Sequence, residues 1–294
     1  MASLEQYARS RLKANVILLR RDLRRVEQMI RYRRYTMDGI PVLFANSFPK
    51  SGTHLLTQVL HGFTKIGPAV NSGLPAIVTF DSKTGDLRRE GEIKRDIKRL
   101  KPGDIAYGHL HSTDSVTTSL CGDGMATYFI LRDPRDVVVS HVYYVTEIES
   151  NHVHHQYYQE ELVDFDERLK TSILGRPDFG DLFPNIRERF EPYLGWLDCP
   201  QVLVLRFEDF VFERQKTNKR IYDHAIECGF PAAVNYQQAI ETLSAGINSE
   251  KSPTFRSGKV GDWRAKFTPQ NRNLFKDIAG DLLNQLGYES TYDW

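Results

Sequence analysis

A short basic turn between an apolar strand and a helix constrains this chain most. Residues 41–60 begin as the apolar run PVLFAN, pass through PKSGT and continue as a helical pattern. The first N–H groups of a helix lack partners inside the helix, and the positive end of its dipole points at the turn. Lys50 adds a full positive charge, and Gly52 lets the backbone approach a ligand closely. With the hydroxyls of Ser51 and Thr53, the turn predicts a phosphate-binding loop.

The order of lysine and glycine excludes the commonest kind of phosphate loop. ATP- and GTP-binding loops have the spacing GxxxxGK[ST], in which the lysine follows the second glycine. Here Lys50 precedes Gly52, and no glycine lies five residues upstream. This order argues against an ordinary nucleoside triphosphatase and against a P-loop kinase. Taken alone, the loop also fits a basic turn that binds no ligand.

The strand–turn–helix pattern recurs at residues 126–144. ATYFIL has the pattern of a buried strand, Arg132 stands at its carboxyl end, and Ser140 lies two turns into the following helix. A local alternative is that Arg132 forms an ion pair with Asp133 or Asp136, and such pairs are weak at a surface. The ion pair alone does not explain why two such units occur in one chain.

A third strand pattern, residues 104–109, ends at a histidine. Ligands of open α/β sheets bind at the carboxyl ends of the strands, so we expect His109 to share an edge with Lys50 and Arg132. His111 lies two residues further along and would face the same side of an extended chain. An imidazole titrates near neutral pH, which suits a general base.

A basic, glycine-containing run lies near the C-terminus. Residues 254–268 read TFRSGKVGDWRAKFT, and Gly258 and Gly261 favour a mobile lid. Together with the earlier segments, this run resembles the sulfotransferases that use 3′-phosphoadenosine 5′-phosphosulfate as sulfuryl donor. The likeness spans roughly residues 41–270 and is greater to bacterial-like or divergent members than to the better-known cytosolic ones.

The resemblance implies one α/β domain over residues 37–294. It would have a central, mostly parallel sheet, helices on both faces and a P-loop-like phosphosulfate-binding loop. Residues 1–36 would precede it as a basic amphipathic helical segment. The chain has 294 residues, of which 40% are hydrophobic, and this suits one large domain with a full core.

The resemblance also assigns a donor site and a mechanism. The positions that match the family's donor-binding motifs are Lys50, Ser51, Gly52, Thr53, His54, Leu55, Arg132, Ser140, Phe207, Arg256, Ser257 and Gly258. His109 matches the base that takes the proton of the acceptor, and Lys50 matches the cation that stabilises the leaving oxygen. In-line attack on sulfur then yields 3′-phosphoadenosine 5′-phosphate, and the scheme requires no metal.

Three sites depart from the better-known cytosolic members. Leu55 replaces a tryptophan that packs on the adenine, Phe207 replaces a tyrosine, and Tyr107 and Gly108 replace a Lys-Thr pair before the base. A catalytically impaired nucleotide-binding protein of the same fold is therefore the alternative. The acceptor is expected to carry a hydroxyl, less readily an amine. Its class stays open among small molecules, lipids and glycans, because acceptor pockets are built from variable loops.

Charge and cysteine content limit the partners and the compartment. The net charge of +1 argues against nucleic-acid binding. Cys121, Cys199 and Cys228 form no CxxC pair, which is typical of reduced thiols in a cytoplasmic protein, and we find no secretory signal or membrane span. The His152–His155 segment holds three histidines, but without a carboxylate or cysteine at ligand spacing it fits a solvated loop that gates the acceptor pocket better than a metal site.

The first 36 residues are strongly basic. Their apolar residues step by four and three from Leu12 to Ile30, which predicts a helix with one apolar seam. The first expectation is a helix docked on the body, with its basic face in solvent. The sharper alternatives are a self-associating helix or a membrane-surface helix that brings the protein to lipid acceptors.

Overall fold

A parallel sheet forms the centre of the protein, in a computed structural model that describes residues 4–81, 84–248 and 258–294. Its strands are β1 (Val42–Ser47), β2 (Val70–Asn71), β3 (Ile77–Val78), β4 (Asp104–His109), β5 (Met125–Leu131) and β6 (Val202–Arg206). The strand order is β2-β4-β1-β5-β6, and β3 also pairs with β4. Every pairing between these strands is parallel, which confirms the predicted sheet.

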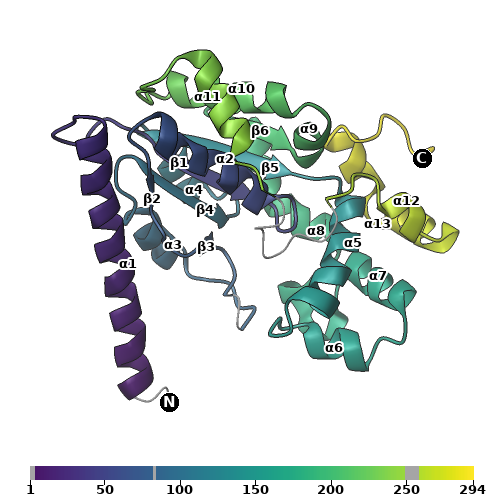
Figure 1. The fold of residues 1–294 in the computed structure, drawn as a ribbon. Coiled ribbons are helices and arrows are strands. Elements are labelled where there is room, and N and C mark those ends of the chain that lie inside the picture. Colours follow the sequence, from purple (N-terminus) through teal and green to yellow (C-terminus); the bar gives the residue numbers. More distant parts are fainter. Residues whose placement is uncertain (1–3, 82–83, 249–257) are drawn as a thin grey trace.

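Helices connect the strands and cover the sheet (Figure 1). The α-helices are α1 (Leu4–Arg31), α2 (Thr53–Ile66), α3 (Glu90–Ile97), α4 (Asp114–Leu120), α5 (Pro134–Tyr143), α6 (His155–Glu160), α7 (Phe165–Leu174), α8 (Ile186–Phe190), α9 (Phe207–Phe212), α10 (Arg214–Glu227), α11 (Tyr236–Ala245), α12 (Trp263–Lys266) and α13 (Pro269–Gln285). A π-helical turn, η1 (Tyr144–Ile148), continues α5, and two 3₁₀ segments, η2 (Pro177–Leu182) and η3 (Glu191–Asp198), flank α8.

Apolar side chains alternate between the two faces of the sheet. Leu43 and Ala45 of β1 pack in one core with α2, α10 and α11, whereas Phe44 packs in a second core with α5, α7 and α13. In β5, Tyr128 and Phe129 divide in the same way. Successive side chains of a strand point to opposite faces, so a strand that is apolar throughout needs a cover on both faces. The predicted layers of helices on both faces are confirmed.

The topology brings three strand ends together. β1 lies between β4 and β5, so the carboxyl ends of these strands are neighbours at one edge of the sheet. Asn46, which is fully buried at the end of β1, donates to the carbonyl of Leu110 (3.0 Å) and accepts from its N–H (2.9 Å). This pair of hydrogen bonds fixes the chain that leaves β4 beside β1. The residues that end or follow the three strands therefore meet.

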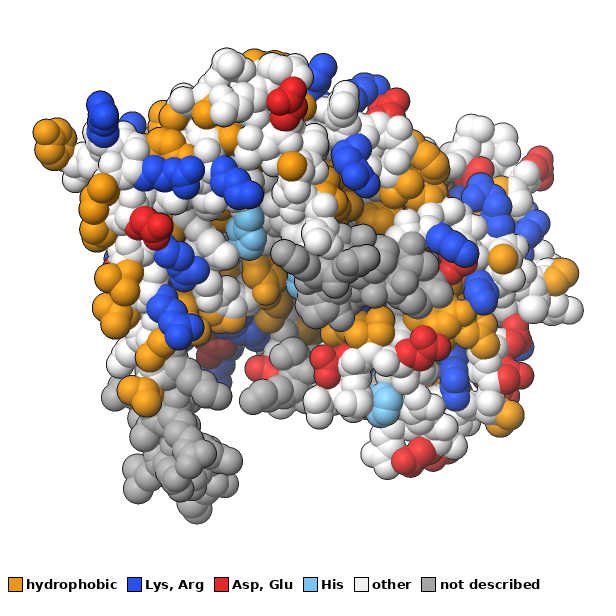
Figure 2. Space-filling view, in the orientation of Figure 1, with side chains coloured by type: hydrophobic (Ala, Val, Ile, Leu, Met, Phe, Trp, Pro, Cys, Tyr) orange, Lys and Arg blue, Asp and Glu red, His pale blue; other side chains and the backbone are white. Residues whose placement is uncertain are grey.

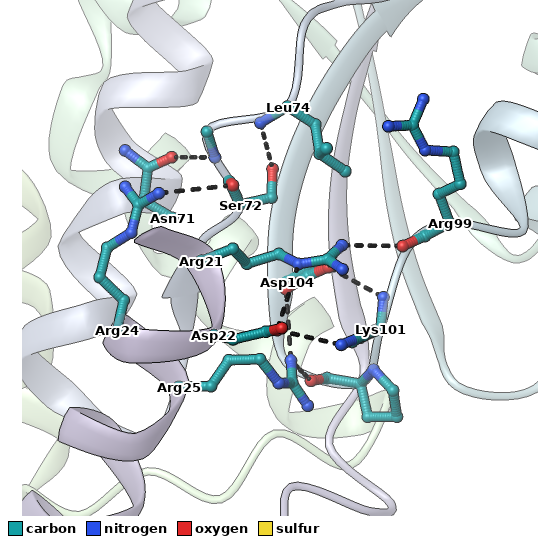
Figure 3. Close-up of polar contacts among 12 residues, drawn as sticks. Arg21, Asp22, Arg24, Arg25, Asn71, Ser72, Leu74, Arg99, Lys101 and Asp104 are labelled. Carbon is teal, nitrogen blue, oxygen red and sulfur yellow. Dashed lines mark hydrogen bonds and ion pairs between the residues drawn. The ribbon is translucent and has the colours of Figure 1, made fainter. Parts of the chain in front are cut away.

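Helix α1 lies along one side of the domain, at the left in Figure 1. Its basic face is docked: Arg21 is 3% exposed, and Arg21 and Arg25 pair with the buried Asp104 at 3.4 and 3.3 Å. Figure 3 shows these contacts, together with the ion pair of Asp22 with Lys101. The expected docking of the helix is confirmed, and the expected solvent exposure of its basic residues holds for Arg20 and Arg31 but is wrong for Arg21 and Arg25. The reason is a buried carboxylate at the start of β4, which holds the arginines against the body.

Among the described residues, no helix has a long enough apolar stretch to span a membrane.

Candidate active site

The turn between β1 and α2 leaves the start of α2 open to a ligand. Lys50 and Gly52 have positive φ angles of 69° and 97°. A Cβ on Gly52 would lie 2.7 Å from the ring of Phe207, so the position combines a left-handed backbone with an approach that only glycine allows. No side chain caps α2, so its first N–H groups are available to an anion.

Lys50 is a half-buried cation with an aromatic neighbour. Its Nζ lies 3.5 Å from the ring centre of Tyr144, the first residue of η1. Burial, followed by the charge of Arg132, lowers the pKa of Lys50 to about 7. None of the ion pairs among the described residues involves Lys50. An anionic ligand beside Lys50 would therefore raise its pKa and keep the ammonium charged.

His109 ends β4 with one ring nitrogen already engaged. Its Nδ1 lies 3.2 Å from the carbonyl oxygen of Ser47 and 3.0 Å from the Ser47 hydroxyl. A carbonyl only accepts, so the tautomer with the proton on Nδ1 fits this contact and leaves the lone pair on Nε2. Burial, with smaller contributions from His54 and Lys50, lowers the pKa of His109 to about 4. The ring is therefore neutral at pH 7, the form that a general base needs.

The second histidine after β4 has a different environment. The ring of His111 packs edge-on against Phe80 (5.3 Å between centroids) and Tyr193 (4.8 Å), and burial lowers its pKa to about 4. His109 lines the cavity described below, whereas His111 does not. Of the two histidines, only His109 lines the cavity, so it is the better placed to act as a base there.

Arg132 connects the end of β5 to the C-terminal segment. Its guanidinium donates to the carbonyl of Lys259 (2.6 Å), pairs with Asp136 (3.4 Å) and lies over the ring of Phe207 (4.5 Å). Asp136 in turn accepts the N–H groups of Gly261 (2.7 Å) and Trp263 (3.0 Å). The local ion pair that the sequence left as an alternative is thus present. The same carboxylate also anchors the segment that follows Gly258.

These side chains line one cavity of about 800 Å³. The sequence-predicted residues in its wall are Lys50, Gly52, Thr53, His54, Leu55, His109, Arg132, Ser140, Phe207 and Gly258. Ser51 is fully buried and is absent from the wall. Arg256 and Ser257 lie outside the described residues. The structure therefore brings together residues from the β1–α2 turn, β4, β5, α5 and α9.

Sequence reasoning missed how Asp136 and Tyr144 take part. Asp136 binds backbone groups 125 and 127 residues away, and no local pattern reports such a contact. The ring of Tyr144 lies against the Nζ of Lys50, 94 residues away in the chain. A π-helical turn is rare and often marks a functional site, but it cannot be read from hydrophobic periodicity.

The His152–His155 segment is less exposed than a solvated loop would be. His154 is 3% exposed and its ring packs on Phe183 (4.3 Å). His152 lines the cavity, and its ring lies 5.6 Å from that of Tyr144. The prediction of a solvated loop is therefore wrong for His154, whose ring is buried by aromatic packing, while His152 and His155 are half-buried. Across residues 4–81, 84–248 and 258–294, no group of side chains has the arrangement of a metal site.

Comparison with known proteins shows the fold. No protein-family model and no curated protein matches the sequence. Mouse sulfotransferase SULT7A1 complexed with PAP is similar over 85% of this chain and 89% of its own, with a TM-score of 0.54 and 20% identity. Retinol dehydratase in a complex with retinol and PAP is similar over 85% of this chain and 83% of its own, with a TM-score of 0.52 and 18% identity. Retinol dehydratase in complex with androsterone and inactive cofactor PAP is similar over 82% of this chain and 80% of its own, with a TM-score of 0.53 and 18% identity. The chain therefore has the sulfotransferase fold.

Proposed function

We propose that this protein is a sulfotransferase, which moves a sulfuryl group from 3′-phosphoadenosine 5′-phosphosulfate to a hydroxyl acceptor. The observation that carries the proposal is the convergence of Lys50, Arg132 and a neutral His109 on one cavity. They come from three separate segments, and the sequence likeness gives the same three residues donor-binding or catalytic roles. The neighbours of the same fold, which are complexed with PAP, support this reading.

The described residues fit the two charged ends of such a donor. Arg132 Nε is buried and has no hydrogen-bond partner among the described residues, so an anion beside it would satisfy a group that is otherwise costly. Arg132 and Ser140 would hold the 3′-phosphate. Lys50, Thr53 and the uncapped N–H groups of α2 would hold the 5′-phosphosulfate. By the likeness, Arg256, Ser257 and Gly258 would close over the 3′-phosphate, while Leu55 would pack against the adenine.

The chemistry then needs one base and one cation. His109 would accept the proton of the acceptor hydroxyl at Nε2, because its Nδ1 is held by Ser47. As the acceptor oxygen forms its bond to sulfur, the bond from sulfur to the phosphate oxygen breaks. Lys50 would stabilise the negative charge that develops on that departing oxygen. The protein contributes position and charge, with no covalent intermediate on a side chain.

The acceptor that fits best is a small molecule with a hydroxyl group. The cavity of about 800 Å³ has the volume of a small-molecule site, and the acceptor would share it with the donor. Phe80, Tyr144 and Tyr193 give its wall an aromatic part, and His152 adds a polar group. Two of the neighbours are complexed with retinol and androsterone, which is compatible with such an acceptor.

The three cysteines are free thiols, in agreement with a cytoplasmic location.

Binding is tested first, because it separates the proposal from a kinase. Calorimetric titration with 3′-phosphoadenosine 5′-phosphate, in a buffer with chelator, should give saturable binding that magnesium does not improve. Lys50→Ala should weaken it strongly, with a thermal unfolding curve as the control for folding. Binding of ATP that requires magnesium, with none of 3′-phosphoadenosine 5′-phosphate, would contradict the proposal.

Transfer is tested second. The labelled donor is incubated with phenols, steroid alcohols, fatty alcohols and glycans, and sulfated product is counted. Leu55 at the adenine position favours a second candidate, a nucleotide-binding protein that has lost catalysis. Tight binding of the nucleotide without transfer to any acceptor would support that candidate and contradict the proposed sulfotransferase activity.

A further inference from the structure

One face of α1 exposes a continuous row of large apolar side chains. We define the α1 seam as Leu12, Val16, Leu19, Leu23, Val26 and Ile30, whose exposed fractions run from 39% to 73%. Figure 2 shows hydrophobic side chains along the outer left edge, where Figure 1 places α1. Soluble proteins rarely leave so regular an apolar row uncovered, so the α1 seam calls for a partner.

The body of the protein cannot be that partner, because it already holds the opposite side of the helix. Arg21 donates to the carbonyl of Arg99 (2.8 Å) and pairs with Asp104. Arg25 donates to the carbonyl of Pro102 (2.7 Å). These contacts, seen in Figure 3, fix the rotation of α1 about its axis and hold the seam outward.

We propose that a second copy of this chain covers the α1 seam, and that the two α1 helices form a coiled coil. The seam steps by four, three, four, three and four residues, so all six residues fall at the a and d positions of one heptad register, as in coiled coils. A helix that docks on a globular body shows a wider apolar stripe, which adds e or g positions. The narrow row therefore favours another helix as the occupant.

The size of the seam suffices for a stable dimer. Six side chains of this size, each about half exposed, present several hundred Å² of apolar surface per copy. Two copies together reach about 1,200 Å², where specific interfaces begin. The ion pairs to Asp104 already hold the helix in place, so dimerisation does not have to order it.

The charges beside the seam favour a second copy over a lipid surface. Arg20, Asp22 and Glu27 flank the seam and are exposed, so its borders carry both signs. Mixed signs are usual at the flanking positions of coiled coils. A membrane-surface helix is instead predominantly basic there, and the exposed carboxylate of Glu27 would be repelled by anionic headgroups.

The proposed dimer leaves the cavity accessible. α1 contacts Asp104 at the first residue of β4, whereas His109 is its last residue. The two residues are five steps apart along the strand, a distance of about 17 Å. Loss of the dimer should therefore leave the activity per chain unchanged.

Sedimentation velocity of the full chain, from low to high micromolar concentration, tests the proposal. The wild type should sediment as a dimer, and the double variant Leu19→Glu, Leu23→Glu as a monomer, with a dissociation constant raised at least a hundredfold. The matched control is Leu87→Glu, since Leu87 is 62% exposed, like Leu19 and Leu23, but lies off the seam. It should remain dimeric, and circular dichroism should show that all three proteins are folded.

Three results would overturn the proposal. The first is a wild-type monomer at every concentration, and the second is a dimer that survives the double substitution. The third concerns lipid: vesicles of phosphatidylcholine and phosphatidylserine are sedimented with the wild type and with the double variant. A monomeric wild type that binds these vesicles, and a double variant that does not, would assign the α1 seam to a membrane.

Discussion

The two ends of β4 differ in whether the charges beside them are balanced within the protein. At the amino end, the carboxylate of Asp104 is fully buried and is matched within the chain by Arg21, Arg25 and the N–H of Lys101. At the carboxyl end, His109 faces a cavity with Lys50 in its wall, and no ion pair of the described residues neutralises that lysine. At the amino end the buried charge is balanced within the protein, whereas at the carboxyl end a positive charge is left for a ligand to balance.

The pKa shifts follow the same contrast. Burial raises the pKa of Asp104, while the N–H of Lys101 and the two arginines oppose that rise. Burial lowers the pKa of Lys50 to about 7, and Arg132 lowers it further in the same direction. Neighbours therefore support the charge at the amino end and oppose it at the carboxyl end. An unfavourable arrangement of cations is what an anion-binding site requires before its ligand arrives.

The largest expected effect is on catalysis. His109→Ala should lower turnover by about 10²- to 10⁴-fold, because it removes the proposed base, and should leave the unfolding temperature nearly unchanged. Turnover is measured with labelled donor at saturating acceptor. His111→Ala, two residues along, is the matched control and should stay within tenfold of the wild type. Equal losses in the two variants would mean that packing, and not proton transfer, explains the effect.

The next largest expected effect is on stability, at the amino end of β4. Asp104→Asn should lower the free energy of unfolding by about 3 kcal/mol, because it leaves Arg21 buried without its counter-charge. Urea unfolding followed by fluorescence measures this. Asp96→Asn breaks the more exposed pair with Arg88 (2.7 Å) and should cost less than about 1 kcal/mol. If the two variants lost the same stability, the ion pair beneath α1 would not be the anchor that we describe.

Two glycines, one at each end of the parallel strands, distinguish the cost of backbone strain from the cost of close packing. Gly124 precedes β5 with a φ of 79° and open space beside it, so Gly124→Ala should cost about 1 kcal/mol. Gly52→Ala adds a contact of 2.7 Å with the ring of Phe207 and should cost about 2 kcal/mol. It should also weaken nucleotide binding about tenfold, measured by calorimetry. Normal binding by Gly52→Ala would show that the anion loop needs no close approach.

The smallest effect is a pH dependence of nucleotide binding. Lys50 has a folded-state pKa of about 7, below its ordinary value of 10.5, and a bound anion would raise it. Binding therefore takes up a proton above pH 7, and affinity should fall by up to tenfold per pH unit between about 7.5 and 9. Calorimetry in this range avoids the second ionisation of phosphate near pH 6. Lys50→Arg keeps its charge throughout the range, so a slope that persisted in this variant would assign the proton elsewhere.

Local sequence determined the elements that carry the site. The turn with Lys50 and Gly52, the arginine after β5 and the histidine that ends β4 were each predicted from their place at a strand end. The parallel topology then makes those ends neighbours. Strand patterns and anion-loop chemistry are set by residues adjacent in the chain, so they can be read without coordinates. Arg256 and Ser257 were assigned by the family likeness alone and stay predictions.

Only the tertiary structure decided which face of α1 is buried, because the carboxylate of Asp104 lies about 80 residues from the arginines it binds. The same holds for the burial of His154 and for the anchoring of the C-terminal segment by Asp136. Hydrophobic periodicity identifies an apolar face but does not say what covers it. Pairing between distant charges depends on where the chain folds back, and that is a property of the packed molecule.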